Sequence, residues 1–132
     1  MRYLLDTDWI IHSLKGMRSV AEKVKELRKD GLAMSMISVA EIYDGIFGSK
    51  NPDKHEEIFK EFLTGVNVLE ISEEVCKKFG QLRNDLRRRG ELIGDFDLLI
   101  ASTALAHSLT ILTNNVKHYE KIQGLKFITS FS

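Results

Sequence analysis

The sequence predicts an α/β fold of three layers, in which a mostly parallel sheet carries helices on both faces. Two observations lead to this prediction: short apolar runs alternate with segments of helical periodicity, and the alternation continues along the whole chain. Strands separated by helices form right-handed crossovers, which make neighbouring strands parallel. Because no stretch resembles a linker or a repeat, residues 1–132 are expected to form one domain.

The first part of the chain begins with a strand and two helices. Residues 3–5 are an apolar run that ends at Asp6, and apolar residues at helical spacing follow over residues 9–14. A stripe of valine and leucine among charged residues predicts an amphipathic helix over residues 20–27, which Gly31 closes.

The middle of the chain repeats the alternation. Residues 32–37 are expected to form a strand, and a helix follows over residues 39–47. A turn at residues 51–53 begins the next helix, whose apolar face extends to residue 63. Residues 66–71 then predict another strand.

The last part of the chain begins with a long helix that Ser72 caps and Gly90 ends. The segment 96–106 is strongly apolar, so it is expected to be a buried helix. A strand, a short helical turn and a last strand complete the prediction, over residues 109–113, 116–122 and 126–128.

Composition restricts the location and the function. The 19 basic residues balance the 19 acidic ones, which excludes nucleic-acid binding through bulk positive charge, so any such binding needs a local patch. A single cysteine, Cys76, points to a reducing environment. No apolar run approaches the roughly 20 residues of a membrane helix, and Asp6 comes too early for a signal peptide. A cytoplasmic protein with no membrane contact is expected.

Acids and amides gather where the predicted strands end. Ligands of open α/β sheets bind beyond the carboxyl ends of the strands, so the polar residues there are the candidate site. Four separate segments contribute them: Asp6, Glu41, the pair Asp95 and Asp97, and the pair Asn114 and Asn115.

Each of these residues also has a local structural explanation. Ser38 and Glu41 match a capping box, in which Glu41 bonds back to the start of its helix. Asp95 is a suitable N-cap, and Asp97 lies in a first helical turn, where the helix dipole favours an anion. The asparagines are ordinary turn residues. Asp6 is the hardest to explain in this way, because the end of a buried strand needs no charge.

Taken together, the acids indicate a cation. Packed carboxylates raise one another's pKa, so a cluster usually holds a metal, and oxygen ligands select hard ions such as Mg²⁺ or Mn²⁺. The four histidines are scattered and expected at the surface, so zinc is not indicated. Such ions activate water for phosphoryl chemistry. Three arginines, Arg83, Arg87 and Arg88, offer contacts for a nucleic-acid backbone, although such charge runs are usually solvated faces.

These residues lie in motifs that resemble the PIN-domain ribonucleases of the VapC toxin type. The similarity extends over nearly the full length. It covers residues 4–8, 35–42, 94–101 with Ala104, and 112–115, followed by Tyr119 and residues 124–125. The segment Gly94-Asp95-Phe96-Asp97-Leu98-Leu99-Ile100-Ala101 is the most specific.

The resemblance implies a PIN-like fold and a metal-dependent endoribonuclease toxin that a small cognate antitoxin inhibits. It places Asp6, Glu41 and Asp97 at the acidic catalytic and metal-binding positions of the family, and it ranks Asp97 above Asp95. Asn115 falls where many members have a fourth acid, which puts a tightly held second ion in doubt. Thr7, Asp8 and Ser38 match polar positions that orient ligands or water.

The resemblance also implies a homodimer. Part of the apolar surface of two helices would form its interface, from Ile42, Tyr43, Ile46, Phe47, Phe59, Phe62 and Leu63. The antitoxin is expected to place an arginine in the acidic pocket, where it would displace or block the metal.

Two other functions are open at this stage, and the pattern of a third, a phosphoacceptor receiver, fails. Residues 6–10 loosely resemble the nucleophile motif of haloacid-dehalogenase-like phosphatases, but no lysine is convincingly placed for that chemistry. A phosphoacceptor receiver needs an Asp after a middle strand and a Lys after a late one, where this chain has Glu70 and Asn114. A catalytically degenerate PIN scaffold is harder to exclude because of Asn115.

Overall fold

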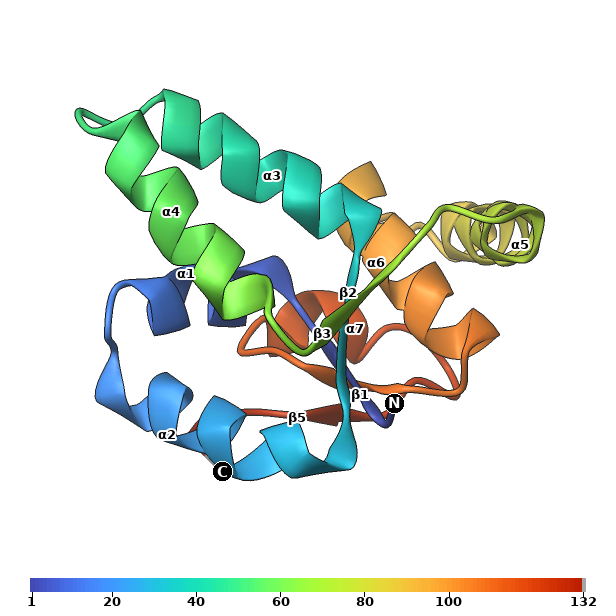
Figure 1. Cartoon of the computed structure of the whole chain (residues 1–132). Coiled ribbons are helices and arrows are strands. Elements are labelled where there is room, and N and C mark those ends of the chain that lie inside the picture. The colour runs from blue at the N-terminus through green and yellow to red at the C-terminus, as the bar shows by residue number, and fades with distance from the viewer. Residues whose placement is uncertain (132) are drawn as a thin grey trace.

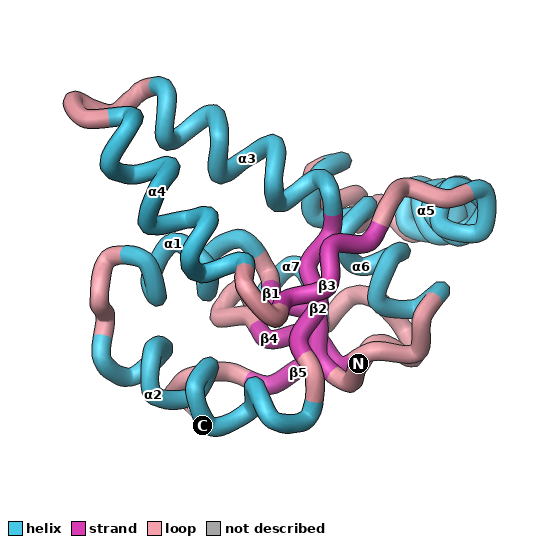
Figure 2. Tube along the Cα trace, viewed as in Figure 1, coloured by secondary structure: helices cyan, strands magenta, loops and turns pink. Residues whose placement is uncertain are grey.

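The centre of the molecule is a parallel sheet of five strands, seen in a computed structural model that describes residues 1–131 (Figures 1 and 2). The strand order is β3-β2-β1-β4-β5, and every neighbouring pair is parallel. The chain runs outward from β1 to one edge and then returns to β4 on the other side of β1. The strand order therefore reverses between β1 and β4, where ligands of such sheets bind. The strands are β1 (Tyr3–Leu5), β2 (Leu32–Ser35), β3 (Val66–Leu69), β4 (Thr110–Leu112) and β5 (Phe127–Ile128).

Helices cover both faces of this sheet. The side chains of α1 to α4 pack in one buried cluster and those of α5 to α7 in another, so the predicted three-layer α/β/α fold is confirmed. Figure 1 shows α3 and α4 as a hairpin on one side of the strands and α5, seen along its axis, on the other. The helices are α1 (Thr7–Leu14), α2 (Arg18–Leu27), α3 (Met36–Phe47), α4 (Pro52–Leu63), α5 (Glu73–Arg88), α6 (Asp95–Ala106) and α7 (Val116–Tyr119), with a 3₁₀ turn η1 (Arg28–Asp30) after α2.

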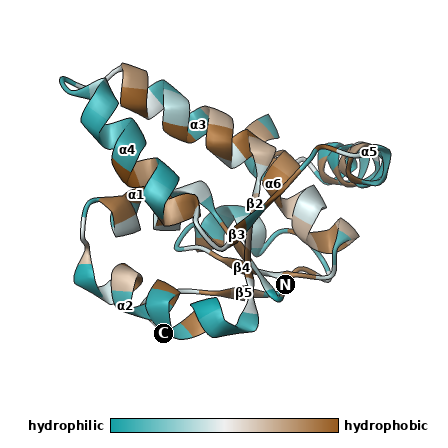
Figure 3. Ribbon diagram, viewed as in Figure 1, coloured by the Kyte–Doolittle hydropathy of each residue, from teal (hydrophilic) through white to brown (hydrophobic). Residues whose placement is uncertain are grey.

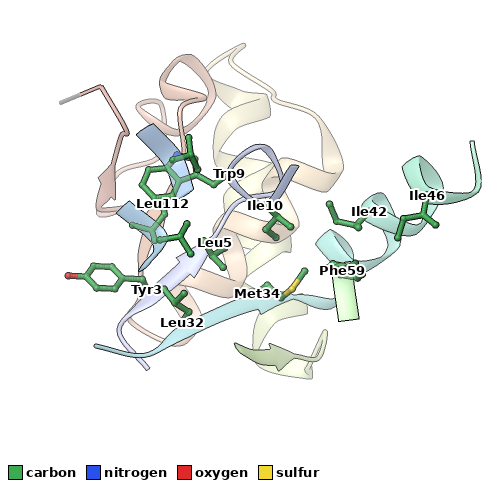
Figure 4. Close-up of a cluster of buried hydrophobic side chains, with 12 residues drawn as sticks. Tyr3, Leu5, Trp9, Ile10, Leu32, Met34, Ile42, Ile46, Phe59 and Leu112 are labelled. Atoms are coloured by element: carbon green, nitrogen blue, oxygen red, sulfur yellow. The ribbon is translucent and has the colours of Figure 1, made fainter. Parts of the chain in front are cut away.

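Alternate residues of the strands supply the two cores. Leu5, Met34 and Leu112 face α1 to α4, where they pack with Trp9 (Figure 4). Leu4, Ala33 and Ile111 point the other way, toward α5 to α7. Central strands buried on both faces explain why their sequences are continuous apolar runs. The outer sides of α2 and α4 are hydrophilic (Figure 3).

The starts of α3 and α6 differ from the prediction, and at α3 a side-chain hydrogen bond is the cause. The strand expected over residues 32–37 ends at Ser35, whose hydroxyl accepts from the Ile37 amide and caps α3. The capping box expected from Ser38 and Glu41 is therefore wrong, since both residues lie inside α3. Gly94, not Asp95, is the N-cap of α6, so the cap expected at Asp95 is also wrong.

The apolar surface expected to mediate a dimer belongs mostly to the core. Ile42, Ile46 and Phe59 are buried in the cluster of α1 to α4, whereas Phe47 is 69% exposed and stacks on Tyr43. Among residues 1–131, no helix is long and apolar enough to cross a membrane.

Candidate active site

All but one of the acids predicted from the strand ends line one open pocket at the carboxyl edge of the sheet, together with Asp8. Asp6 and Asp8 come from the start of α1, Glu41 from α3 and Asp97 from α6. The other lining residues are Thr7, Ile11, Asn114 and Asn115. Residues more than 100 positions apart therefore meet at the point where the strand order reverses.

Asp6 is the buried floor of this pocket, with an exposed fraction of only 3%. It caps α1, because its Oδ1 accepts from the Thr7 amide at 2.9 Å. The Tyr119 hydroxyl donates to the same oxygen at 3.2 Å, and the Thr113 hydroxyl donates to Oδ2 at 2.7 Å. Burial, and then the charge of Asp8, raise the pKa of Asp6 to about 7 despite the hydrogen bonds from Thr113 and Thr7.

Asp8 lies beside Asp6 and is held by two backbone amides. Its Oδ1 accepts from Trp9 at 2.7 Å and its Oδ2 accepts from Asn114 at 2.9 Å. Burial raises the pKa of Asp8, while these hydrogen bonds and His12 oppose the rise. The second bond ties the start of α1 to the segment after β4, so it fixes the pocket between β1 and β4.

A chain of hydroxyls holds Glu41. The Thr7 hydroxyl lies 2.7 Å from Glu41 Oε1 and 2.8 Å from the Ser38 hydroxyl. Because Thr7 has one hydroxyl proton and a carboxylate only accepts, Thr7 donates to Glu41 and Ser38 donates to Thr7. Burial raises the pKa of Glu41, and the charge of Asp97 adds to this effect. Glu41 therefore faces the pocket rather than capping its own helix.

Asp97 contacts two side chains from the segment after β4. Asn115 Nδ2 lies 3.3 Å from Asp97 Oδ2, and His118 Nδ1 lies 2.6 Å from the same oxygen. Asp95 points elsewhere: its Oδ1 accepts from Arg83 Nε at 3.1 Å at the contact of α6 with α5. Asp97 thus lines the pocket and Asp95 does not.

The predicted RNA-contacting arginines do not line the pocket. Arg83 is engaged by Asp95, and Arg87 donates to Asn84 on the exposed side of α5. Arg88 is exposed at the end of the same helix. Contact between these arginines and RNA stays a prediction.

The side chains that hold Asp6 in place were not assigned that role from the sequence. They are Thr113 and Tyr119, whose hydroxyls donate to Asp6. His118 was expected at the surface, where its side chain is indeed 41% exposed, but its contact with Asp97 was not predicted. One signal was available in the sequence. Tyr119 and His118 directly follow Asn115, which falls at the fourth acidic position of the family.

The donor types in this pocket fit a hard divalent cation. Four carboxylates in one pocket repel one another, and two of their oxygens, Glu41 Oε2 and Asp97 Oδ1, receive no hydrogen bond from residues 1–131. Within the same residues, no group of three or more His, Cys, Asp or Glu side chains has a metal-holding arrangement. Metal ligation by Asp6, Glu41 and Asp97 therefore stays a prediction, supported by donor chemistry.

An apolar groove adjoins the acidic pocket. It has a volume of about 470 Å³ and shares Ile11 and Glu41 with that pocket. Its walls come from α1, α3 and α4, and they include Leu14, Lys15, Ile42, Gly45, Ile46, Ser49, His55 and Ile58.

Comparison with known proteins gives consistent matches over the whole chain. The PIN domain family matches residues 3–124. Ribonuclease VapC1 of Haemophilus influenzae (strain R2866) is 37% identical over 129 residues, which cover 96% of both chains. The tRNA(fMet)-specific endonuclease VapC of Shigella flexneri is 27% identical, also over 96% of both chains. Among solved structures, a chain of VapBC2 from Rickettsia felis, bound to a DNA fragment from its promoter, matches with a TM-score of 0.91 and 30% identity over 98% of both chains.

Proposed function

Because this chain belongs to the PIN-domain family and, within it, to the VapC ribonucleases, we propose that it is a metal-dependent endoribonuclease and the toxin of a toxin–antitoxin pair. The observation that supports this most directly is the pocket in which Asp6, Asp8, Glu41 and Asp97 meet. Such a pocket suits phosphodiester hydrolysis, since a divalent cation would offset both the crowded carboxylates and the charge of the scissile phosphate.

The residues of the pocket would have different roles in catalysis. Asp6 and Asp97 would hold Mg²⁺ or Mn²⁺, directly or through water, and the bound ion would supply an activated water and a positive charge at the phosphate. Glu41, held by Thr7, is placed to orient that water or to add a ligand. Thr113 and Tyr119 keep the buried Asp6 carboxylate in one orientation. Because water attacks, the products carry 5′-phosphate and 3′-hydroxyl ends.

Cleavage of purified RNA in the presence and absence of EDTA tests this proposal. Total RNA and initiator tRNA are suitable substrates, the second because of the name of the Shigella relative. We expect cleavage with Mg²⁺ or Mn²⁺, none in EDTA, and none by Asp97→Asn, while Asp95→Asn stays active as the matched control. Full activity in EDTA, or 2′,3′-cyclic ends, contradicts the mechanism.

Two outcomes would instead support the rival functions. Metal binding without cleavage of any RNA would indicate a degenerate PIN scaffold. A phosphorylated Asp6, trapped from a phosphate ester, would indicate a phosphatase.

The protein partner is proposed to be a small antitoxin, as in the VapBC complexes whose structures this chain resembles. The apolar groove would seat an apolar antitoxin segment, and an arginine from that segment would reach Glu41 and the acidic pocket next to it. Ile58→Asp, in the wall of the groove, should abolish inhibition by the antitoxin but not RNA cleavage. Inhibition at wild-type strength would exclude this groove.

A homodimer remains part of the proposal. Phe47, exposed and stacked on Tyr43, is the member of the predicted dimer surface that is most available for it. Sedimentation should show a dimer at micromolar concentration. A monomer at high micromolar concentration would contradict this part of the proposal.

A further inference from the structure

His118 contacts an acid of the pocket from an element that contributes none of the four carboxylates. It lies on α7, the four-residue helix after β4, and its side chain is 41% exposed. Its Nδ1 atom lies 2.6 Å from Asp97 Oδ2, the shortest side-chain contact around the pocket. Asn115, the N-cap residue of α7, makes no capping bond with its side chain. Its amide instead lies 3.3 Å from the same Asp97 oxygen and 2.8 Å from His118 Nδ1.

The short contact determines where the ring proton lies. Without a proton on Nδ1, the ring lone pair and the Asp97 oxygen would be two acceptors 2.6 Å apart, which is repulsive. A neutral ring with its proton on Nδ1 is sufficient, and it donates that proton to Asp97 Oδ2. Asn115 Nδ2 and the ring N–H then both donate to Asp97 Oδ2, so the 2.8 Å contact between these two nitrogens is not a hydrogen bond.

Because both donors contact the same atom, the two oxygens of the Asp97 carboxylate have different hydrogen bonding. Oδ2 receives both contacts, while Oδ1 receives no hydrogen bond from residues 1–131. A carboxylate held in this way can turn only one oxygen toward a ligand of the pocket. Side chains that hydrogen-bond to metal-binding carboxylates fix their orientation, and their loss typically lowers metal affinity about 10–100-fold.

We infer that His118 is a positioning residue, which holds Oδ2 of Asp97 through Nδ1–H so that Oδ1 faces the divalent ion. The inference rests on the proposed function, because it assigns Asp97 to the metal site. The helix α7 then orients two acids, because the neighbouring Tyr119 donates a hydrogen bond to Asp6. One turn of helix thus orients both carboxylates assigned to the metal.

Substitutions of His118 separate this role from a structural one. The Asn amide nitrogen is as many bonds from Cα as His Nδ1, whereas the Gln nitrogen is one bond further, at the place of Nε2. We therefore expect His118→Ala to weaken Mn²⁺ binding about 10–100-fold, His118→Asn to restore most of it, and His118→Gln to restore little. His107→Gln, an exposed histidine just after α6, is the matched control and should bind as wild type. Circular dichroism checks the fold of every variant.

Two measurements on the Mn²⁺ protein decide the outcome. Titration by electron paramagnetic resonance gives the affinities, and electron spin-echo modulation reports whether a nitrogen binds the ion. Equal affinity of wild type and His118→Ala, rescue by Gln but not Asn, or absence of Mn²⁺ binding overturns the inference. A ¹⁴N coupling in wild type that disappears in His118→Asn also overturns it, because His118 would then be a ligand.

The RNA assay is scored separately. If the affinities follow the expected order but no RNA is cut, the inference stands and the proposed function fails. If RNA is cut but His118→Ala binds Mn²⁺ normally, the proposed function stands and the inference fails.

Discussion

Replacement of Asp6 by asparagine should stabilise the metal-free protein at neutral and alkaline pH. Asp6 is almost fully buried, and its pKa of about 7 lies well above its ordinary value of 3.8. The folded state therefore binds the Asp6 proton more tightly than the unfolded state does. In such a case the free energy of unfolding is highest below about pH 4 and falls as the pH rises to about 7.

The size of the effect follows from this difference in pKa. A rise from 3.8 to about 7 corresponds to a loss of about 4 kcal/mol once Asp6 is fully ionised in the fold. The substituted asparagine has no charge, so the variant escapes this loss. Its amide can still accept from Thr7 and Tyr119 and can donate to the Thr113 hydroxyl. We expect the stability of Asp6→Asn relative to wild type to increase by about 4 kcal/mol between pH 4 and pH 8.

Urea unfolding in EDTA at several pH values measures this difference. The only tryptophan, Trp9, is fully buried, so its fluorescence reports the loss of the core. Asp95→Asn is the control, since Asp95 is exposed in a surface ion pair and should give a nearly flat difference. Mn²⁺ should stabilise wild type but not Asp6→Asn. The free energy of unfolding of Asp6→Asn minus that of wild type should grow toward pH 8. If it stays constant or shrinks, burial does not raise the pKa of Asp6 as described.

Three other substitutions test the scaffold of the site. Thr7→Val removes the donor to Glu41 and should lower RNA cleavage about tenfold or more in a kcat measurement, with circular dichroism unchanged. Gly31→Ala should lower the melting temperature, because φ at Gly31 is +90° and the new Cβ would lie 2.8 Å from the backbone of Met1; an unchanged melting temperature would contradict this. Ser35→Ala loses the cap of α3 and should cost about 1 kcal/mol in urea unfolding; an unchanged unfolding midpoint would contradict this.

The meeting of the acids could be predicted because it depends on topology. Parallel strands end at one edge of a sheet, so the residues that follow β1, β2 and β4 are brought together, and Asp97 joins them because α6 begins at the same edge. The choice between Asp95 and Asp97 could not be made from helical periodicity alone. Two residues apart on α6, they point in different directions. The packing of α5 places Arg83 against Asp95 and leaves Asp97 to the pocket.

The contacts that orient the carboxylates were harder to predict. His118 lies on a helix of four residues, too short to show a periodicity that would assign its face. Its contact with Asp97 depends on the path of the chain after β4. The end of β2 was missed for a similar reason, since Met36 and Ile37 are apolar and the Ser35 hydroxyl alone marks the start of α3.

The order of the site along the chain has a consequence for protein synthesis. The side chains that fix Asp6 and Asp97, from Thr113 to Tyr119, lie in the final fifth of the polypeptide. A ribosome that has translated only as far as α6 therefore carries all four acids but none of their hydrogen-bond donors from beyond β4. Strand β1 also lacks its neighbour β4 until that stage. The ordered arrangement of Asp6 and Asp97 described above therefore forms only after residues 113–119 have been translated.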